Sequence, residues 1–431
     1  MPGPTGQTGL IRDDLAWRLL RDGYRALDRE RRRHDGRDAF ATRMLARRTV
    51  VVRGEEGARL FYDEAVVART RAVPPPLAWL LFGRGAVHGL DGAAHRERKR
   101  LFLEVLTPER TEPLVAAVRA RLQDRVPSWK HGTPVFDELV EVYGGAVLSW
   151  AGIRLDDVEA ARVSHRLAEI VDGFGFAGVA YARGWRSRLV ANRWARRLVR
   201  EVREGSSIVQ RDRPLGMIAA RADLDDRTAA VELLNVLRPT VAVAWPATLA
   251  TAQLLRSPEP ATVTSDELLR PYVHECRRLQ PFAPRTDRPG PPHRDRRRSG
   301  AAPGRPDRAR RRRHPHRPAH LVARPRRPPP PSAFEPRRFA DGEPSPYALV
   351  PQGGGDPATG HRCPGEPLTV RLLEVTLREI ARHGLRPVAG GEPDLRRMPT
   401  LPDPPLRVTR TSPDAAGTPG YWHGGGRPVG D

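Results

Sequence analysis

The spacing of apolar residues along the chain predicts a mostly helical protein. Residues 12–31 and 91–122 carry apolar side chains at helical intervals, and nearly every periodic segment from Asp137 to about Gln253 repeats that spacing. The segment RTVVVR at 48–53 is instead rich in valine and indicates a short strand. We therefore expect a mainly α fold with a minor β region near the start of the chain.

One apolar run stands out by its length and by its prolines. The run AAVELLNVLRPTVAVAWPATLATAQLL carries Pro239 and Pro246, where an undisturbed helix would lose hydrogen bonds and clash with the preceding turn. The pattern predicts a helix that is kinked near its middle. A kink in a buried helix suggests a working site.

A glycine-rich loop leads to one of the two cysteines. The segment LVPQGGGDPATGHRCPGE ends at Cys363, and Pro364 stands where it can open a helix that ends at Gly384. Backbone N–H groups and the positive end of the helix dipole favour a sulfur anion, and Arg362 adds charge beside it. Two interpretations stay open at this point, a metal-ligating thiolate and a buried free cysteine.

Two further motifs accompany the cysteine loop. Glu275 and Arg278 form an E-x-x-R pair, which by itself is typical of an exposed ion pair, and the segment PRRF at 336–339 follows before the loop. The three motifs in this order resemble the signature of the cytochrome P-450 superfamily. The resemblance implies a cytochrome P-450-like fold, haem b with its iron bound by Cys363, and an ionic network of Glu275, Arg278 and Arg338 that braces the loop.

The loop departs from the common superfamily pattern at two positions. Asp356 and His361 stand where most members carry phenylalanine and a basic residue. The loop is instead similar to the bacterial fatty-acid peroxygenase branch, as are the segments FGRGAVHGLDGAAHRERK, ELLNVLRPT and RMPTLP. The resemblance covers residues 12–284 and 332–410. It implies an oxidoreductase that hydroxylates or decarboxylates long-chain fatty acids with hydrogen peroxide and without a redox partner; the alternative is an O₂-dependent monooxygenase with redox partners.

The centre of the long apolar run bears on the reaction. O₂-using members normally carry an acid and a threonine there, whereas this chain has Arg238, Pro239 and Thr240, so no carboxylate is available as a general acid. The Arg238 guanidinium can hold a fatty-acid carboxylate in a bidentate pair, from which that carboxylate shuttles the peroxide protons. An arginine on a solvated helix face is the alternative, but the neighbours are apolar.

Other site residues follow from the resemblance. It places Phe82 and His88 in the substrate pocket, where His88 can donate a proton or orient the carboxylate and so favour loss of CO₂ over hydroxylation. His95, Arg98 and Lys99 lie on a helix that Asp91 can cap, at spacings that let two or three of them face one ligand. His95 and Arg98 are expected to bind the haem propionates with Arg362, and a solvated basic helix face is the alternative.

The net charge of +23 is concentrated in one segment. Residues 285–331 contain 16 Arg, three Asp and 12 Pro, and so contribute 16 − 3 = +13 to the charge. A segment of this composition cannot form a core.

The same segment can be explained by a shift of reading frame. The codons for RARRRRHPHRPAHLV can be chosen so that reading them one base later gives VLDVAGTHTDPRTW, a pattern that the resemblance leads us to expect here. We hypothesise a frame error near Arg285 and a compensating one near Pro331. The alternatives are an inactive, frame-disrupted relative and a disordered insertion that binds nucleic acid.

The remaining composition predicts a cytoplasmic protein. There are two cysteines, no apolar run of about 18 residues that could span a bilayer, and no signal-peptide pattern at the N-terminus. We expect a single cytochrome P-450-like domain at 12–410, flanked by disordered ends at 1–11 and 411–431, with a disordered stretch at 285–331 and with neither nucleic acid nor a membrane as partner.

Overall fold

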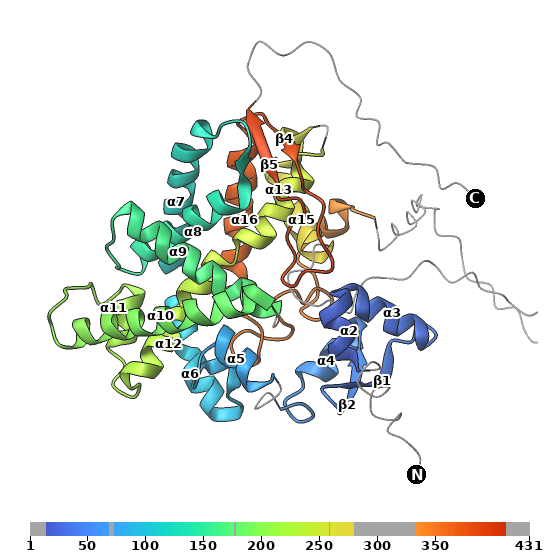
Figure 1. Cartoon of the computed structure of the whole chain (residues 1–431), viewed down its shortest axis with the longest axis horizontal. Helices are drawn as coiled ribbons and strands as arrows, with labels where there is room; N and C mark the ends of the chain where they lie inside the picture. Colours follow the sequence, from blue (N-terminus) through green and yellow to red (C-terminus); the bar gives the residue numbers. More distant parts are fainter. Residues whose placement is uncertain (1–13, 69–72, 176–177, 258, 280–332, 411–431) are drawn as a thin grey trace, which may run out of the picture.

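The computed structural model describes residues 14–68, 73–175, 178–257, 259–279 and 333–410. The segments expected at 1–11, 285–331 and 411–431 lie outside the described residues, so the hypotheses about them remain predictions. The described part is mainly helical with two small sheets, as the apolar spacing predicts (Figure 1).

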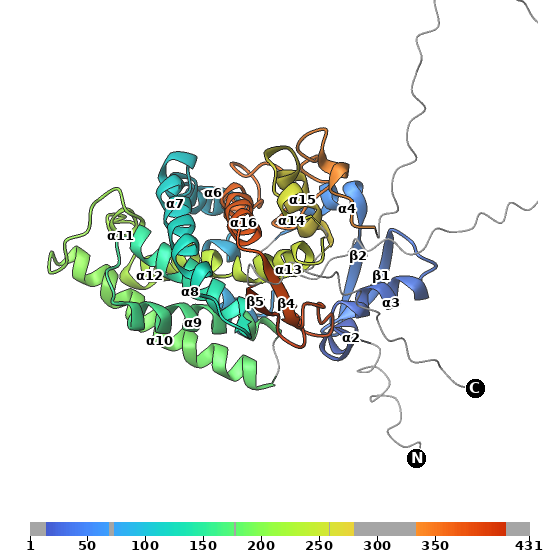
Figure 2. The same ribbon diagram turned by 90° about the horizontal axis from the view of Figure 1, so that it is seen from above.

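The N-terminal region forms a small layer of helices and a hairpin. Strands β1 (Ala39–Met44) and β2 (Arg47–Val52) pair antiparallel, which confirms the strand expected at 48–53 and adds a partner for it. Figures 1 and 2 both place this hairpin with α2 (Leu15–Asp22) and α3 (Arg25–Arg33) on the opposite side of the molecule from α10 (Gly178–Arg203) and α11 (Pro214–Ala219).

The main body is a helical core around α8 (Val135–Trp150), α12 (Asp226–Val241) and α16 (Glu366–Ala381). Tyr143 of α8 and Thr376 of α16 are both buried, and their hydroxyls lie 2.7 Å apart in a hydrogen bond. The other helices are α4 (Gly54–Tyr62), α5 (Pro75–Leu81), α6 (Gly92–Val105), α7 (Pro108–Arg125), α9 (Asp157–Asp172), α10 (Gly178–Arg203), α11 (Pro214–Ala219), α13 (Ala244–Leu254), α14 (Pro260–Val263) and α15 (Asp266–Leu279).

The second sheet lies at the end of the chain. Strand β5 (Arg407–Arg410) pairs antiparallel with both β3 (Thr133–Pro134) and β4 (Leu385–Ala389). This sheet joins the chain before α8 to the chain after α16, and so ties the C-terminal part to the helical core.

The long apolar run is broken at its middle. Helix α12 ends at Val241 and α13 begins at Ala244, with Pro239 in the last turn of α12 and Pro246 in the first turn of α13. The helix is therefore interrupted at its middle, as predicted, because two prolines seven residues apart remove two helical hydrogen bonds from one short stretch. The intervening Ala242 and Val243 keep right-handed helical backbone angles.

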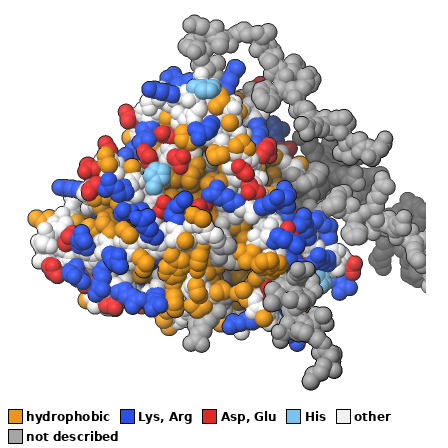
Figure 3. Space-filling model, viewed as in Figure 1, with side chains coloured by type: hydrophobic (Ala, Val, Ile, Leu, Met, Phe, Trp, Pro, Cys, Tyr) orange, Lys and Arg blue, Asp and Glu red, His pale blue; other side chains and the backbone are white. Residues whose placement is uncertain are grey.

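The surface of the described part mixes charges of both signs. On the face drawn in Figure 3, lysine and arginine side chains alternate with acidic and hydrophobic ones. No helix among the described residues is long and apolar enough to cross a lipid bilayer.

Candidate active site

The cysteine loop ends against the first turn of α16. The Cys363 N–H donates to the Gln352 carbonyl over 2.9 Å, and the helix begins at Glu366, with Pro367 in its first turn. The expectation that Pro364 opens the helix is wrong by two residues, because Gly365 occupies the N-cap position. The sulfur still lies just before a helix N-terminus.

The surroundings of the sulfur do not by themselves favour the thiolate, contrary to our expectation. Burial raises the pKa of Cys363 above its ordinary value, and hydrogen bonding from the Gly365 N–H and the charge of Lys99 offset this only in part. Arg362 is engaged elsewhere, since its Nε donates to Glu366 Oε2 over 2.7 Å. A cation bound directly at the sulfur would supply the missing stabilisation.

The predicted ionic network is present as a buried cluster. Glu275 is completely buried and accepts from Arg278 Nε and NH2 at 2.6 and 2.7 Å. The Glu335 N–H donates to the same carboxylate over 2.8 Å, and Arg338 Nε lies 3.7 Å from it. The cluster thus joins α15 to the PRRF segment, which forms the short 3-10 helix η4 (Pro336–Phe339).

A second ion cluster, which the sequence argument missed, lies directly under the cysteine loop. Arg277 of α15 pairs with Glu366, and its NH2 donates to Gln352 Oε1 over 3.1 Å. Both charged partners are buried. Arg277 adjoins Arg278 in the chain, and only its burial distinguishes it from a surface arginine.

Arg238 is a buried cation with a neutral partner. Its side chain is 5 % exposed, its NH2 donates to Asn235 Oδ1 over 3.3 Å, and no carboxylate among the described residues pairs with it. Burial, together with the charge of Arg188, lowers its pKa to about 9, so the guanidinium is still charged at neutral pH. A buried charge of this kind is unstable without an anion.

Phe82 and His88 lie beside Arg238. Their rings stack with centroids 4.1 Å apart, and Arg238 Cζ lies 5.9 Å from the centroid of the Phe82 ring. Burial, and then the charge of Arg238, lowers the pKa of His88 to about 3. His88 is therefore neutral at neutral pH and offers one ring N–H as a donor.

The cations of α6 contact different partners. Arg98 NH1 donates to Glu232 Oε1 over 2.9 Å and to the Gly85 carbonyl over 3.3 Å, and its contact with a haem propionate remains a prediction. Lys99 instead faces the cysteine loop and donates to the carbonyls of Gly360 and, over 2.8 Å, Arg362. Asp91 occupies the N-cap position of α6 without a capping hydrogen bond from its side chain.

His95 completes the α6 side of the site. Its buried ring stacks on that of His361, with centroids 4.0 Å apart. Burial, and then the charge of His361, lowers the pKa of His95 to about 4. The Nδ1 atom of His95 has no hydrogen-bond partner within the described part of the chain.

Three residues show that the site encloses a space. Burial shifts the pKa values of Cys363 and His88, so protein surrounds both side chains. Both nevertheless keep accessible surface, as does Pro239, although Arg238 and Thr240 on either side of it are buried. We infer that these side chains line an internal cavity.

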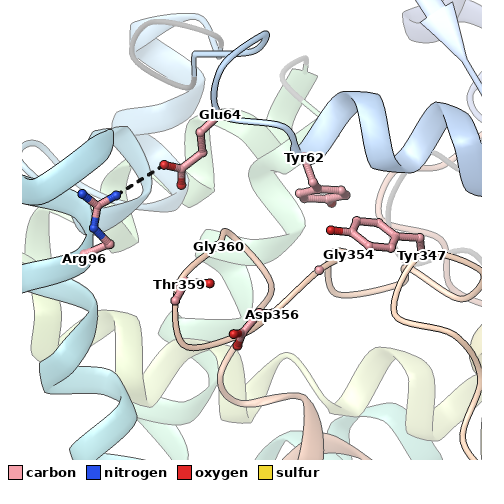
Figure 4. A pocket seen from close by; sticks show the side chains of 9 residues that line it. Tyr62, Glu64, Arg96, Tyr347, Gly354, Asp356, Thr359 and Gly360 are labelled. Atoms are coloured by element: carbon pink, nitrogen blue, oxygen red, sulfur yellow. Dashed lines mark ion pairs between the residues drawn. The ribbon is translucent and has the colours of Figure 1, made fainter.

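A separate open pocket of about 470 Å³ lies on the other side of the cysteine loop. Figure 4 shows the Tyr62 and Tyr347 rings facing each other beside Gly354, with Glu64 paired to Arg96 at the far edge. None of the predicted catalytic residues lines this pocket.

The comparisons with known proteins are consistent with this geometry. No protein-family model matches the chain. A structure of a variant of cytochrome P-450SP alpha (CYP152B1) is 30 % identical, covers 92 % of this chain and 99 % of its own, and has a TM-score of 0.77. The same protein in complex with (R)-ibuprofen is 29 % identical, covers 92 % and 98 %, and has a TM-score of 0.76. Ligand-free cytochrome P-450 OleT, 23 % identical over 92 % and 96 % with a TM-score of 0.77, shares the fold.

These likenesses define the class of the protein as a cytochrome P-450, a haem-thiolate oxidoreductase whose cofactor is haem b. Within that superfamily the chain belongs to the fatty-acid peroxygenase family of cytochrome P-450SP alpha. The fold, the family and the cofactor implied by the sequence resemblance are thereby confirmed.

The residues present fit haem b. The sulfur of Cys363 lies in surroundings that leave its anion short of positive charge, which an iron ion would supply. The unpartnered Nδ1 of buried His95 can serve a propionate.

Proposed function

We propose that this chain is a peroxygenase that uses hydrogen peroxide to hydroxylate or decarboxylate long-chain fatty acids. Cys363 would bind the iron, neutral His95 would hydrogen-bond a propionate, and Lys99 and Arg98 would supply positive charge beside it. When bound, haem b supplies the iron at which peroxide is activated for oxidation of the substrate chain. The protein's own residues bind the acid, orient it and handle the protons.

The unpaired charge of Arg238 is the observation that carries this proposal. A buried guanidinium with only an amide partner favours binding of an anion, and a carboxylate matches its planar pair of N–H donors. The cytochrome P-450SP alpha complex contains (R)-ibuprofen, which is itself a carboxylic acid. A fatty-acid carboxylate at Arg238 would lie beside Pro239, where it can accept a proton from peroxide and return it.

His88 would influence the product. Its neutral ring can donate one N–H to the bound carboxylate and so hold it in one orientation. A carboxylate paired with Arg238 would also cancel part of the positive charge that lowers the pKa of His88. The stack on Phe82 fixes the plane of the imidazole and closes the pocket on that side.

The test is turnover with hydrogen peroxide and a long-chain fatty acid in the absence of any reductase. Arg238→Ala should lose most of this activity, because removal of a buried ionic partner costs about 2–5 kcal/mol, on the order of thirtyfold or more in binding. Arg227→Ala, at an exposed position of the same helix, is the matched control and should retain activity.

Two results would contradict the proposal. Full peroxide activity of Arg238→Ala would require a different partner for the carboxylate. Turnover that depends on O₂ and an electron-transfer protein would instead assign the chain to the monooxygenases.

A further inference from the structure

Glu232 is a buried carboxylate at the centre of α12 that the sequence argument did not use. Its side chain is completely buried, yet three donors meet it from three segments. Oε1 accepts from the Val87 N–H at 3.0 Å and from Arg98 NH1 at 2.9 Å, and Oε2 accepts from Asn235 Nδ2 at 3.0 Å. Burial raises the pKa of Glu232, whereas the hydrogen bonds from Asn235, Arg98 and Val87 lower it, and since all three partners are donors the geometry favours the ionised carboxylate.

Asn235 connects this carboxylate to the substrate-binding arginine. Its amide nitrogen faces Glu232, and its amide oxygen accepts from Arg238 NH2 at 3.3 Å. The orientation of an amide is assigned from its partners. Here the partners leave one choice, since a carboxylate can only accept and a guanidinium can only donate.

The same carboxylate fixes the segment that carries the pocket histidine. Val87 immediately precedes His88 in the 3-10 helix η1 (Val87–Gly89), and its N–H is held by Glu232. Arg98, bound to the same oxygen, also donates to the carbonyl of Gly85 at 3.3 Å. Glu232 is therefore linked to both groups that the proposed function places around the fatty-acid carboxylate: to Arg238 through Asn235, and to His88 through Val87.

We propose that Glu232 is a positioning residue that sets the orientation of Arg238 through Asn235 and of His88 through the backbone of Val87. This inference rests on the proposed function. The carboxylate of Glu232 is hydrogen-bonded to its own three donors and not to Arg238. Glu232 therefore orients Arg238 without neutralising the guanidinium charge. Arg238 thereby stays available to an anionic substrate.

Glu232→Gln disrupts this arrangement with little change of shape. The new amide nitrogen must face a donor, either Asn235 Nδ2 or the pair formed by Val87 and Arg98. Rotation of the Asn235 amide would relieve the first conflict but would turn its nitrogen toward Arg238. The Arg238 guanidinium would then face an amide N–H instead of an amide oxygen, so it would lose its hydrogen-bond acceptor.

The experiment compares the binding of a long-chain fatty acid and of its methyl ester to the haem-loaded enzyme, followed by the shift of the Soret band. Glu232→Gln should weaken binding of the acid about tenfold, the equivalent of one charge-assisted hydrogen bond, and leave binding of the ester unchanged. Glu379→Gln is the matched control, because Glu379 is equally buried and bonded to Arg382 on the distant part of α16. It should bind both ligands as the wild type does.

Asn235→Ala provides the second test and leaves Glu232 with Val87 and Arg98. It should weaken acid binding to a similar extent, and Glu232→Gln added to it should cause less loss than it does alone, because both act on Arg238 along one path. The product ratio should change with Glu232→Gln and not with Asn235→Ala. If Glu232→Gln does not bind haem, the test consists of the comparison of acid binding by Asn235→Ala with acid binding by Glu379→Gln.

The inference is overturned if Glu232→Gln binds the acid normally, if the ester is weakened equally, or if the losses from the two substitutions add. Normal acid binding by Asn235→Ala overturns it as well. Failure of the proposed function is recognised separately, because Arg238→Ala would then leave acid binding unchanged.

Discussion

Substitution of Glu275 by glutamine tests how strongly the buried ion cluster holds α15 to the segment before the cysteine loop. The carboxylate accepts two hydrogen bonds from Arg278 and one from the Glu335 N–H, and Arg338 lies 3.7 Å away. Breaking a buried ion pair by removing one partner costs about 3–5 kcal/mol. Glutamine keeps one accepting oxygen, and the Arg278 and Arg338 side chains are 17 % and 23 % exposed, so water can solvate them in part.

We therefore expect the lower end of that range, about 3 kcal/mol, which is roughly a hundredfold in the equilibrium between folded and unfolded protein. The measurement is urea unfolding of the haem-loaded enzyme, followed both by far-ultraviolet circular dichroism and by the haem absorbance. The midpoint should fall clearly for Glu275→Gln. The haem signal should be lost at or before the helical signal, because the cluster borders the loop that carries Cys363.

Glu97→Gln is the matched control for this substitution. Glu97 also pairs with an arginine three residues away, but the two side chains are 55 % and 68 % exposed. Exposed pairs contribute about 0–1 kcal/mol, so the midpoint should hardly move. If Glu275→Gln shifted the midpoint no more than Glu97→Gln does, the cluster would not stabilise the fold, and the argument from burial would be refuted.

Three further predictions concern the haem, the product and the gene. Cys363→Ser should abolish the red-shifted Soret band that reduced, CO-bound thiolate haem gives, and an unchanged band would exclude Cys363 as the ligand. His88→Gln should shift the products from terminal alkene towards hydroxy acid at unchanged haem content, and an unaltered ratio would make His88 a bystander. Nucleotide sequencing across codons 280–335 should show codons compatible with the displaced frame, and a gene repaired to that frame should yield protein that retains haem better and melts at a higher temperature; incompatible codons would refute the frame hypothesis.

The sequence predicted the parts of the site that depend on order along the chain. The E-x-x-R pair, the PRRF segment and the cysteine loop follow one another at recognisable spacing, and the structure brings Glu275, Arg278 and Arg338 into one cluster. Mainly helical content followed from apolar periodicity, and the break between α12 and α13 followed from Pro239 and Pro246. These features depend on residues close together in the chain, so the amino-acid sequence alone is enough to predict them.

The contacts that the sequence could not predict depend on burial and on partners far away in the chain. Arg98 and Lys99 are adjacent on α6, and their spacing from His95 does not say which one meets the cysteine loop. The answer comes from Glu232, more than 130 residues away, which pairs with Arg98 and leaves Lys99 to face the loop. Glu232 had one sequence signal, since it is an acid within an otherwise apolar helical run, where a charge needs partners.

The Glu275 cluster also bears on the segment that the structure does not describe. Arg278 NH2 donates to the Ala333 carbonyl at 3.1 Å, and the Glu335 N–H donates to Glu275, so the two ends of the gap at 280–332 are bonded to each other. Lengthening a closed loop costs little, about 0.6 kcal/mol for each doubling of its length. The cluster can therefore join α15 to the cysteine loop whatever conformation the intervening residues adopt. The position of the cysteine loop then depends on the residues flanking the gap, Arg278 and Ala333 among them.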